Sequence, residues 1–169
     1  ALIRRYGSKS LDRQQALSYQ LMRWYYEQNL RGHRFAYHWV ADSVFMGPYP
    51  VNHVFGVHID LIQFLCTYHQ INGHRSAGRY LKRLHMIPWK MSGLLDSLGE
   101  REEVNVLPPR FVIDKCLAQL EEFLDTPIEE NPLLTSFIER MEASGKFSVR
   151  AAVRFKNRVR ESIERDVLP

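Results

Sequence analysis

Hydrophobic residues recur at three- and four-residue intervals along almost the whole chain, which is the spacing of one face of an α-helix. No segment shows the strict alternation of a β-strand, and no Asn-Gly hairpin separates two alternating runs. The pattern predicts an all-α protein, built as an irregular array of about seven or eight helices. We expect residues 1–169 to form a single helical domain or a fragment of a larger one.

The first half of the chain contains four predicted helices, which are separated by breakers such as "GPYP" and "INGH". They cover residues 11–30, the segment from about 53 to 66, and residues 76–87 and 88–102. An aromatic stretch at 35–46 lies between the first two. Ser10 and Asn52 are the predicted N-caps, because their side-chain oxygens can accept a free backbone N–H of a first turn. The inward side of the second helix is predicted to consist of Val54, Val57, Leu61 and Leu65.

The second half has clearer helix boundaries. Two prolines precede a helix at 110–124, whose apolar stripe consists of Val112, Cys116, Leu120 and Phe123. Asn131-Pro132 then supplies a cap and a first-turn proline for the next helix. The last helix is predicted to bury Val149, Ala152, Val153, Val159 and Ile163. Because this helix stops close to the last residue, we expect the chain to be cut from a longer protein.

Composition and charge narrow the class of protein. Hydrophobic residues make up 45% and charged residues 25% of the chain, which is typical of a globular protein. No run of about 18 apolar residues occurs, so no transmembrane segment is expected. The net charge of +4 comes largely from residues 146–160, where Arg150, Arg154 and Arg158 recur every four residues. We interpret this helix face as solvated or paired with acidic groups of the same protein; nucleic acid is not an expected partner, because the patch is narrow.

The histidines are the candidates for metal chemistry, because two pairs of them are spaced five residues apart. The pairs are His33 with His38 and His53 with His58. Positions five apart on a helix diverge by about 140°, so neither pair could bind one ion if both members are helical. No histidine is followed by glutamate, and the H-E-x-x-H motif of zinc peptidases is therefore absent from these residues.

A looser trio of Cys66, His69 and His74 also contains zinc-binding residue types. A structural zinc site needs a fourth ligand, and none lies nearby in the sequence. We therefore predict a core cysteine, a histidine beside a turn and an exposed histidine. No metal ligand, cofactor or catalytic residue is predicted in this chain.

The segment "PYPVNHVFGVHIDLIQFL", residues 48–65, is predicted to be scaffold. In this interpretation His58 lies at the edge of the core, beside the inward stripe. Gly56 is expected in the first helical turn, where it allows a neighbouring backbone to approach closely. Each residue of the segment then has a structural role.

Several motifs in this order resemble one known family. They are "YPVNHVFGVHIDLIQFL", "YHQI", "AGRYLKRL", "LPPRFVIDKCLAQLEEFL" and "NPLLTSF". Together they resemble the bacterial and invertebrate family called domain of unknown function 885, over residues from about 15 to 169. His53 and Pro50 depart from its pattern, since the family often has Gln and a small residue there.

The resemblance implies a large helical protein similar to the carboxypeptidase Taq-like zinc metallopeptidases. In that family the H-E-x-x-H helix and a further acidic ligand lie in the C-terminal half, so zinc is expected only in a part of the parent that lies outside this chain. The resemblance implies that metal-activated water attacks a peptide carbonyl with a glutamate as base.

The leading hypothesis is that this chain is a non-catalytic helical scaffold of a zinc-dependent peptidase and lines its substrate cleft. Arg110 is the first candidate for contacting substrate, because a guanidinium at a helix start could hold a carboxylate. A salt bridge from Arg110 to a neighbouring helix is the alternative. His53 and His58 are further candidates.

The competing hypothesis is a binding or structural module that associates with other protein chains. It could be a catalytically dead relative or a processed fragment. The expected partners are the remaining portion of the parent or another chain, together with a peptide substrate. A third hypothesis, in which the basic face at 146–160 binds nucleic acid, stays open at this point.

Overall fold

The computed structural model describes residues 11–32, 34 and 49–169. Secondary structure in these ranges is helical, with an isolated bridge between Val51 and Gly56, and this confirms the all-α class. The chain divides into two units, Ala1–Pro48 and Tyr49–Pro169. The predicted cap Ser10, the aromatic stretch 35–46, and His33 and His38 lie outside the described residues.

The first unit contains helix α2 (Arg13–Gly32). Asp12, directly before the helix, forms a reciprocal cap with Gln15: the Asp12 carboxylate accepts from the Gln15 N–H at 2.8 Å, and the Gln15 side chain accepts from the Asp12 N–H at 3.1 Å. Each side chain satisfies a backbone donor that the first turn leaves free.

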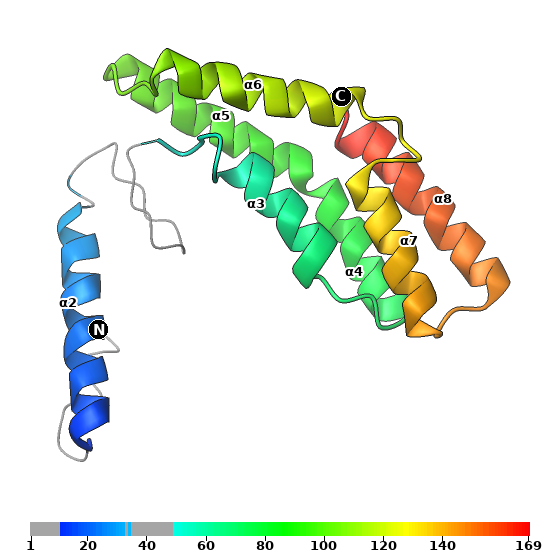
Figure 1. The fold of residues 1–169 in the computed structure, drawn as a ribbon, viewed down its shortest axis with the longest axis horizontal. Helices are drawn as coiled ribbons and strands as arrows, with labels where there is room; N and C mark the ends of the chain where they lie inside the picture. Colours follow the sequence, from blue (N-terminus) through cyan, green and yellow to red (C-terminus); the bar gives the residue numbers. More distant parts are fainter. Residues whose placement is uncertain (1–10, 33, 35–48) are drawn as a thin grey trace. The chain divides into compact units, whose positions relative to one another are not determined.

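The second unit contains the remaining described helices, which Figure 1 shows. These are α3 (Val57–Gln63), which continues as the π-helical segment η1 (Phe64–Tyr68), α4 (His74–His85), α5 (Ile87–Glu103), α6 (Arg110–Asp125), α7 (Pro132–Ser144) and α8 (Val149–Asp166). Helix α7 packs against η1 and α8, and α4 packs against α8. None of the described helices is long and apolar enough to span a membrane.

The core of this unit lies where α4, η1, α7 and α8 meet. Tyr80, Phe137 and Leu65 are fully buried there, and the Tyr80 and Phe137 ring centroids are 5.0 Å apart. The Tyr80 hydroxyl donates to the Leu133 carbonyl at 2.8 Å, so the one polar atom of this buried side chain is satisfied. Burial raises the pKa of Tyr80 far above its ordinary value. The hydroxyl is therefore a permanent donor that ties α4 to the start of α7.

Arg140 of α7 holds the end of the α3–η1 helix. Its guanidinium donates to the carbonyl of Leu65 at 2.7 Å and to the carbonyl of His69, and its Nε donates to the Ser136 carbonyl at 2.8 Å. The last turn of a helix leaves its carbonyls without backbone partners. A charged planar donor group satisfies two of them at once, which fixes η1 against α7.

His69, directly after η1, completes this junction as a buried neutral side chain. Its Nε2 lies 3.1 Å from the Ser76 carbonyl, and its Nδ1 faces the Arg83 guanidinium. The carbonyl requires a proton on Nε2, which leaves Nδ1 to accept from Arg83. Burial, together with the positive charges of Arg83 and Arg140, lowers the pKa of His69.

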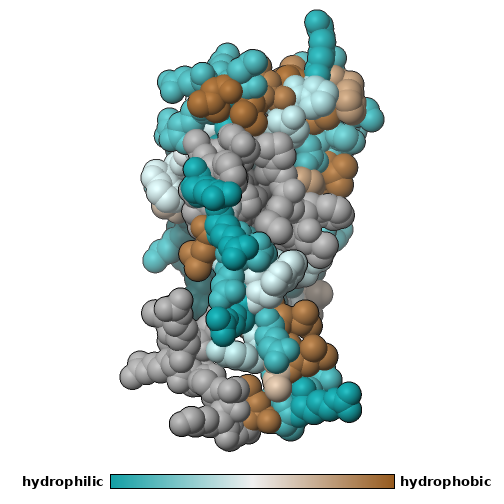
Figure 2. All heavy atoms as spheres, turned by 90° about the vertical axis from the view of Figure 1, so that its left-hand side faces the viewer, coloured by the Kyte–Doolittle hydropathy of each residue, from teal (hydrophilic) through white to brown (hydrophobic). Residues whose placement is uncertain are grey.

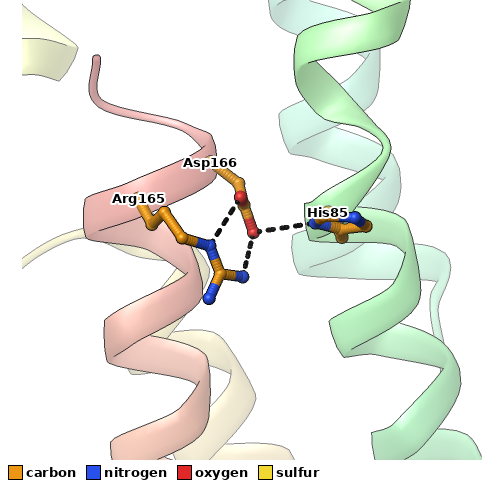
Figure 3. Close-up of polar contacts among 3 residues, drawn as sticks. All are labelled: His85, Arg165 and Asp166. Carbon is orange, nitrogen blue, oxygen red and sulfur yellow. Dashed lines mark hydrogen bonds and ion pairs between the residues drawn. The ribbon is translucent and has the colours of Figure 1, made fainter.

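The far ends of α4 and α8 are joined by an ion-pair cluster around Asp166 (Figure 3). Arg165 donates to both oxygens of this carboxylate, at 2.9 and 2.6 Å, and the His85 Nδ1 lies 3.4 Å from it. The Arg165 hydrogen bonds lower the pKa of Asp166, and the His85 contact acts in the same direction. The charged form of the carboxylate is thus held between two helices.

The helix boundaries of the second half match the sequence prediction closely. Helix α6 begins after Pro109, and the Asn131 side chain caps α7 by accepting from the Leu133 N–H at 3.0 Å. In the last helix, the predicted burial of Val159 and Ile163 is correct. The predicted burial of Val149 and Val153 is wrong: they are 85% and 56% exposed, because the helix buries Phe155 instead.

The Arg140 clamp leads to a stability prediction. We expect Arg140→Ala to lower the free energy of unfolding by about 2–3 kcal/mol, since two helix-end carbonyls lose a charged donor. Arg140→Lys should lose less, because an ammonium group can bond one carbonyl but lacks the planar fork. Urea unfolding followed by circular dichroism measures both, and Arg150→Ala on the exposed face of α8 is the control. Equal stabilities of Arg140→Ala and the control would contradict the clamp.

The buried His69 leads to a prediction about pH. Because the folded-state pKa is lowered, the unfolded chain takes up a proton below about pH 6.5 that the folded chain does not bind. Stability should therefore fall as the pH falls below about 6.5, and the His69 contribution should level off below the folded-state pKa. His69→Gln should reduce this slope in urea titrations at successive pH values. An unchanged slope would show that another group causes the dependence.

Candidate functional site

The candidate site begins with a tight turn at residues 51–56 rather than with a helix. The Asn52 side chain accepts from the Val54 N–H at 2.7 Å and from the Phe55 N–H at 3.0 Å, and the Asn52 N–H donates to the Phe55 carbonyl at 3.0 Å. Asn52 thus stabilises the turn, and α3 begins later, at Val57. The predicted helix cap at Asn52 is therefore wrong. So is the inward position of Val54, which is 65% exposed.

Gly56 sets how closely this turn approaches the helix that follows. Its φ is +136°, a conformation that side chains other than glycine rarely adopt. A Cβ at this position would lie 3.0 Å from the Val51 Cα and 3.1 Å from the His58 ring. The close approach expected at Gly56 is present, but at the residue before α3 rather than inside its first turn. The absence of a side chain at Gly56 lets the His58 ring lie close to the turn.

A cavity of about 610 Å³ lies beside this turn. Its walls come from the turn, α3, the start of α5, the C-terminal half of α6 and the residue after α8. Most of the lining is apolar, with Ile59, Leu61, Ile62, Ile87, Met91, Leu120, Phe123, Leu124 and Val167. Such a volume with a mainly apolar lining is typical of sites that bind small molecules or peptide side chains.

His53 and His58 both line this cavity. The sequence argument against the pair assumed that both were helical, and that assumption is wrong because His53 lies in the turn. The His53 ring meets Phe111 edge-on at 6.4 Å between centroids, and its carbonyl accepts from the Gln119 side chain at 3.1 Å. The latter bond ties the turn to α6.

His58 is an unusual feature of the lining. Both of its ring nitrogens are buried without a hydrogen-bond partner in the described part of the chain, as is the Nδ1 of His53. Burial lowers the pKa of His58, and the negative charge of Asp60 opposes this in part. The imidazole is therefore held neutral, which agrees with its expected place at the edge of the core.

Three more polar side chains reach the cavity: Gln63, Gln119 and Glu122. Sequence analysis did not single them out, because nothing local distinguishes them from other polar residues on helices. The available indication was a polar residue inside an apolar pattern, as at Gln63 in α3 and Gln119 in α6. The pairing of Gln119 with the turn at His53 spans 66 positions and depends on tertiary packing.

Arg110 lies away from this cavity. Its side chain is 93% exposed at the start of α6, and its Nε is 3.6 Å from the Asp114 carboxylate one turn later. The salt bridge is therefore made within its own helix rather than to a neighbouring one. The structure places Arg110 outside the cavity lining, whereas His53 and His58 are brought together.

The described residues do not fit a zinc site. No group of three or more His, Cys, Asp or Glu side chains is placed to hold a metal ion in residues 11–32, 34 and 49–169. In the trio considered above, the Cys66 thiol donates to the Pro132 carbonyl at 3.4 Å, and His74 stacks on Phe155 at 5.7 Å. These side chains have other partners and do not converge.

Comparison with known proteins bears on family and fold. The whole chain, residues 1–169, matches the model of the family described as "Bacterial protein of unknown function (DUF885)". No curated protein matches the chain. A solved structure described as that of "the putative lipoprotein from Colwellia psychrerythraea" is similar, with a TM-score of 0.76 and 18% sequence identity.

The similar region covers 80% of this chain and 23% of that lipoprotein, so the chain corresponds to about a quarter of the length of its structural relative. At this identity the likeness concerns the fold alone. The family match is independent of it and covers every residue. The chain belongs to the DUF885 family of bacterial proteins.

Proposed function

We propose that this chain is a helical, non-catalytic scaffold of a zinc-dependent peptidase and that its cavity forms part of the wall of the peptide-binding cleft. The observation that carries the proposal is the cavity of about 610 Å³, whose lining is mainly apolar with a few polar side chains. Peptide side chains are recognised by pockets of this composition. The resemblance of the family to zinc metallopeptidases supplies the type of reaction.

In this proposal the described residues bind and position a substrate, and they hold no metal. His58 and His53 line the cavity, while Gln119 holds the turn against α6. Arg110 does not line this cavity, and its exposed guanidinium lies beside Asp114. Zinc and its ligands belong to other parts of the full-length protein.

A second candidate function, a module that binds other protein chains, is favoured by a different observation. Several large apolar side chains of α5 and α6 are exposed in the described structure: Trp89, Leu95, Phe111, Leu117 and Leu124. Figure 2 shows hydrophobic residues at the surface between hydrophilic ones on the face that it draws. Exposed apolar surface of this kind is typical of interaction sites.

The cleft proposal is tested by filling the cavity in the full-length protein. Leu120 lines the cavity and is 39% exposed, so Leu120→Trp should occupy part of the cavity without disturbing the core. We expect the KM for a hydrolysed peptide to rise about ten-fold, as for the loss of one apolar side-chain contact. The kcat and the zinc content should stay unchanged, because the substitution removes binding rather than chemistry.

The matched control is Leu117→Trp, at a 50% exposed position of the same helix that does not line the cavity. Equal KM values for the two variants would contradict a role of the cavity in binding substrate. Absence of peptide hydrolysis by the zinc-loaded full-length protein would contradict the peptidase and favour the binding module.

The metal assignment has its own test. We expect residues 1–169, expressed alone and dialysed against micromolar zinc, to retain far less than one zinc per chain by elemental analysis. The reason is that no group of three potential ligands converges in the described ranges. One tightly bound zinc per chain would place the metal site in this part of the protein and overturn the scaffold assignment.

A further inference from the structure

The charged side chain in the lining of the cavity is negative. Glu122 of α6 is the acidic residue of the lining, and the lining contains no Lys or Arg. The Glu122 carboxylate forms no ion pair in the part of the chain that the structure describes. Asp60 adds a second negative charge nearby, close enough to His58 to act on its imidazole. The lining therefore combines apolar walls with one carboxylate that no Lys or Arg of the lining neutralises.

The neutral state of His58 strengthens this asymmetry. A protonated imidazole would offset the carboxylates, but burial holds His58 in its uncharged form. Glu122 itself lies beside apolar lining residues such as Phe123 and Leu120. A ligand that places an apolar group in the cavity and a cation at its edge would match both properties.

We infer that the cavity binds the amino-terminal residue of a peptide, with an apolar side chain against the walls and the free α-ammonium group beside Glu122. This inference rests on the proposed function and names the substrate class of the same cleft. In an amino-terminal residue, the side chain and the ammonium group leave the same Cα. This short separation suits a carboxylate that lines the cavity itself, whereas a lysine would carry its charge on a long flexible stem.

The inference is tested by titrating the full-length protein with small probes, in the presence of a chelator so that no hydrolysis occurs. The probes are leucine N-methylamide, its N-acetyl derivative, and N-acetyl-leucyl-lysine N-methylamide. Binding is followed by the ¹³C-methyl NMR signals of Ile59, Ile62 and Ile87, which line the cavity. We expect the free amine to bind about three-fold more tightly than both acetylated probes, as for a partly exposed ion pair.

Two matched variants assign the charge. Glu122→Gln should remove the preference for the free amine, while Glu121→Gln, on the same helix but outside the lining, should retain it. Equal binding of the free and acetylated probes to the unmodified protein would overturn the inference. So would an undiminished preference in Glu122→Gln, or binding of the lysine probe as tight as that of the free amine.

A third variant separates this inference from the proposed function. If Leu120→Trp abolishes binding of every probe but acetylation has no effect, the cavity is an apolar subsite and only the amino-terminal preference is wrong. If Leu120→Trp and its control Leu117→Trp bind all probes equally, the cavity is not the binding site. Both the inference and the cleft proposal are then overturned.

Discussion

The fold of the second unit depends on how the α3–η1 helix ends. Five residues of π-helix widen the last turn, and a helix that stops there leaves carbonyls pointing at α7. Arg140 satisfies those of Leu65 and His69, which are 75 and 71 positions away in the sequence. One guanidinium therefore fixes the position of α3, which supplies one wall of the cavity. Without this donor, the carbonyls would have to be solvated and the packing of η1 on α7 would open.

The need to pair backbone groups at helix ends also explains where polar side chains lie in an otherwise apolar core. The Tyr80 hydroxyl donates to the Leu133 carbonyl, and the Asn131 side chain accepts from the Leu133 N–H, which the first turn of α7 leaves without a backbone partner. Each of these bonds joins a helix end to a buried side chain. The core is thus organised around helix termini, and its apolar residues fill the space between them.

Sequence reasoning succeeded where structure is set by neighbours in the chain. The cap at Asn131, the start after Pro109 and the helical class follow from local geometry, and the structure confirms them. It failed at Asn52, where an Asx turn and a helix cap use the same side-chain oxygen and differ only in the backbone that follows.

The cavity could not be predicted, because its walls come from segments far apart in the sequence. His53 and His58 were chosen for their residue type, and Arg110 was chosen for a helix start that proved to face solvent.

Helices α3 and α6, which both line the cavity, differ in how strongly the rest of the structure constrains them. The wall from α3 is constrained, since a Cβ at Gly56, directly before this helix, would crowd the Val51 Cα and the His58 ring, and since η1 is fixed by Arg140. The wall from α6 is different, because Leu120, Glu122 and Leu124 are exposed and support little of the core. In the proposed cleft, substitutions on α6 would therefore alter ligand preference at small cost in folding. Under that proposal, a lineage would diversify its specificity through one face of α6 while the wall from α3 stayed fixed.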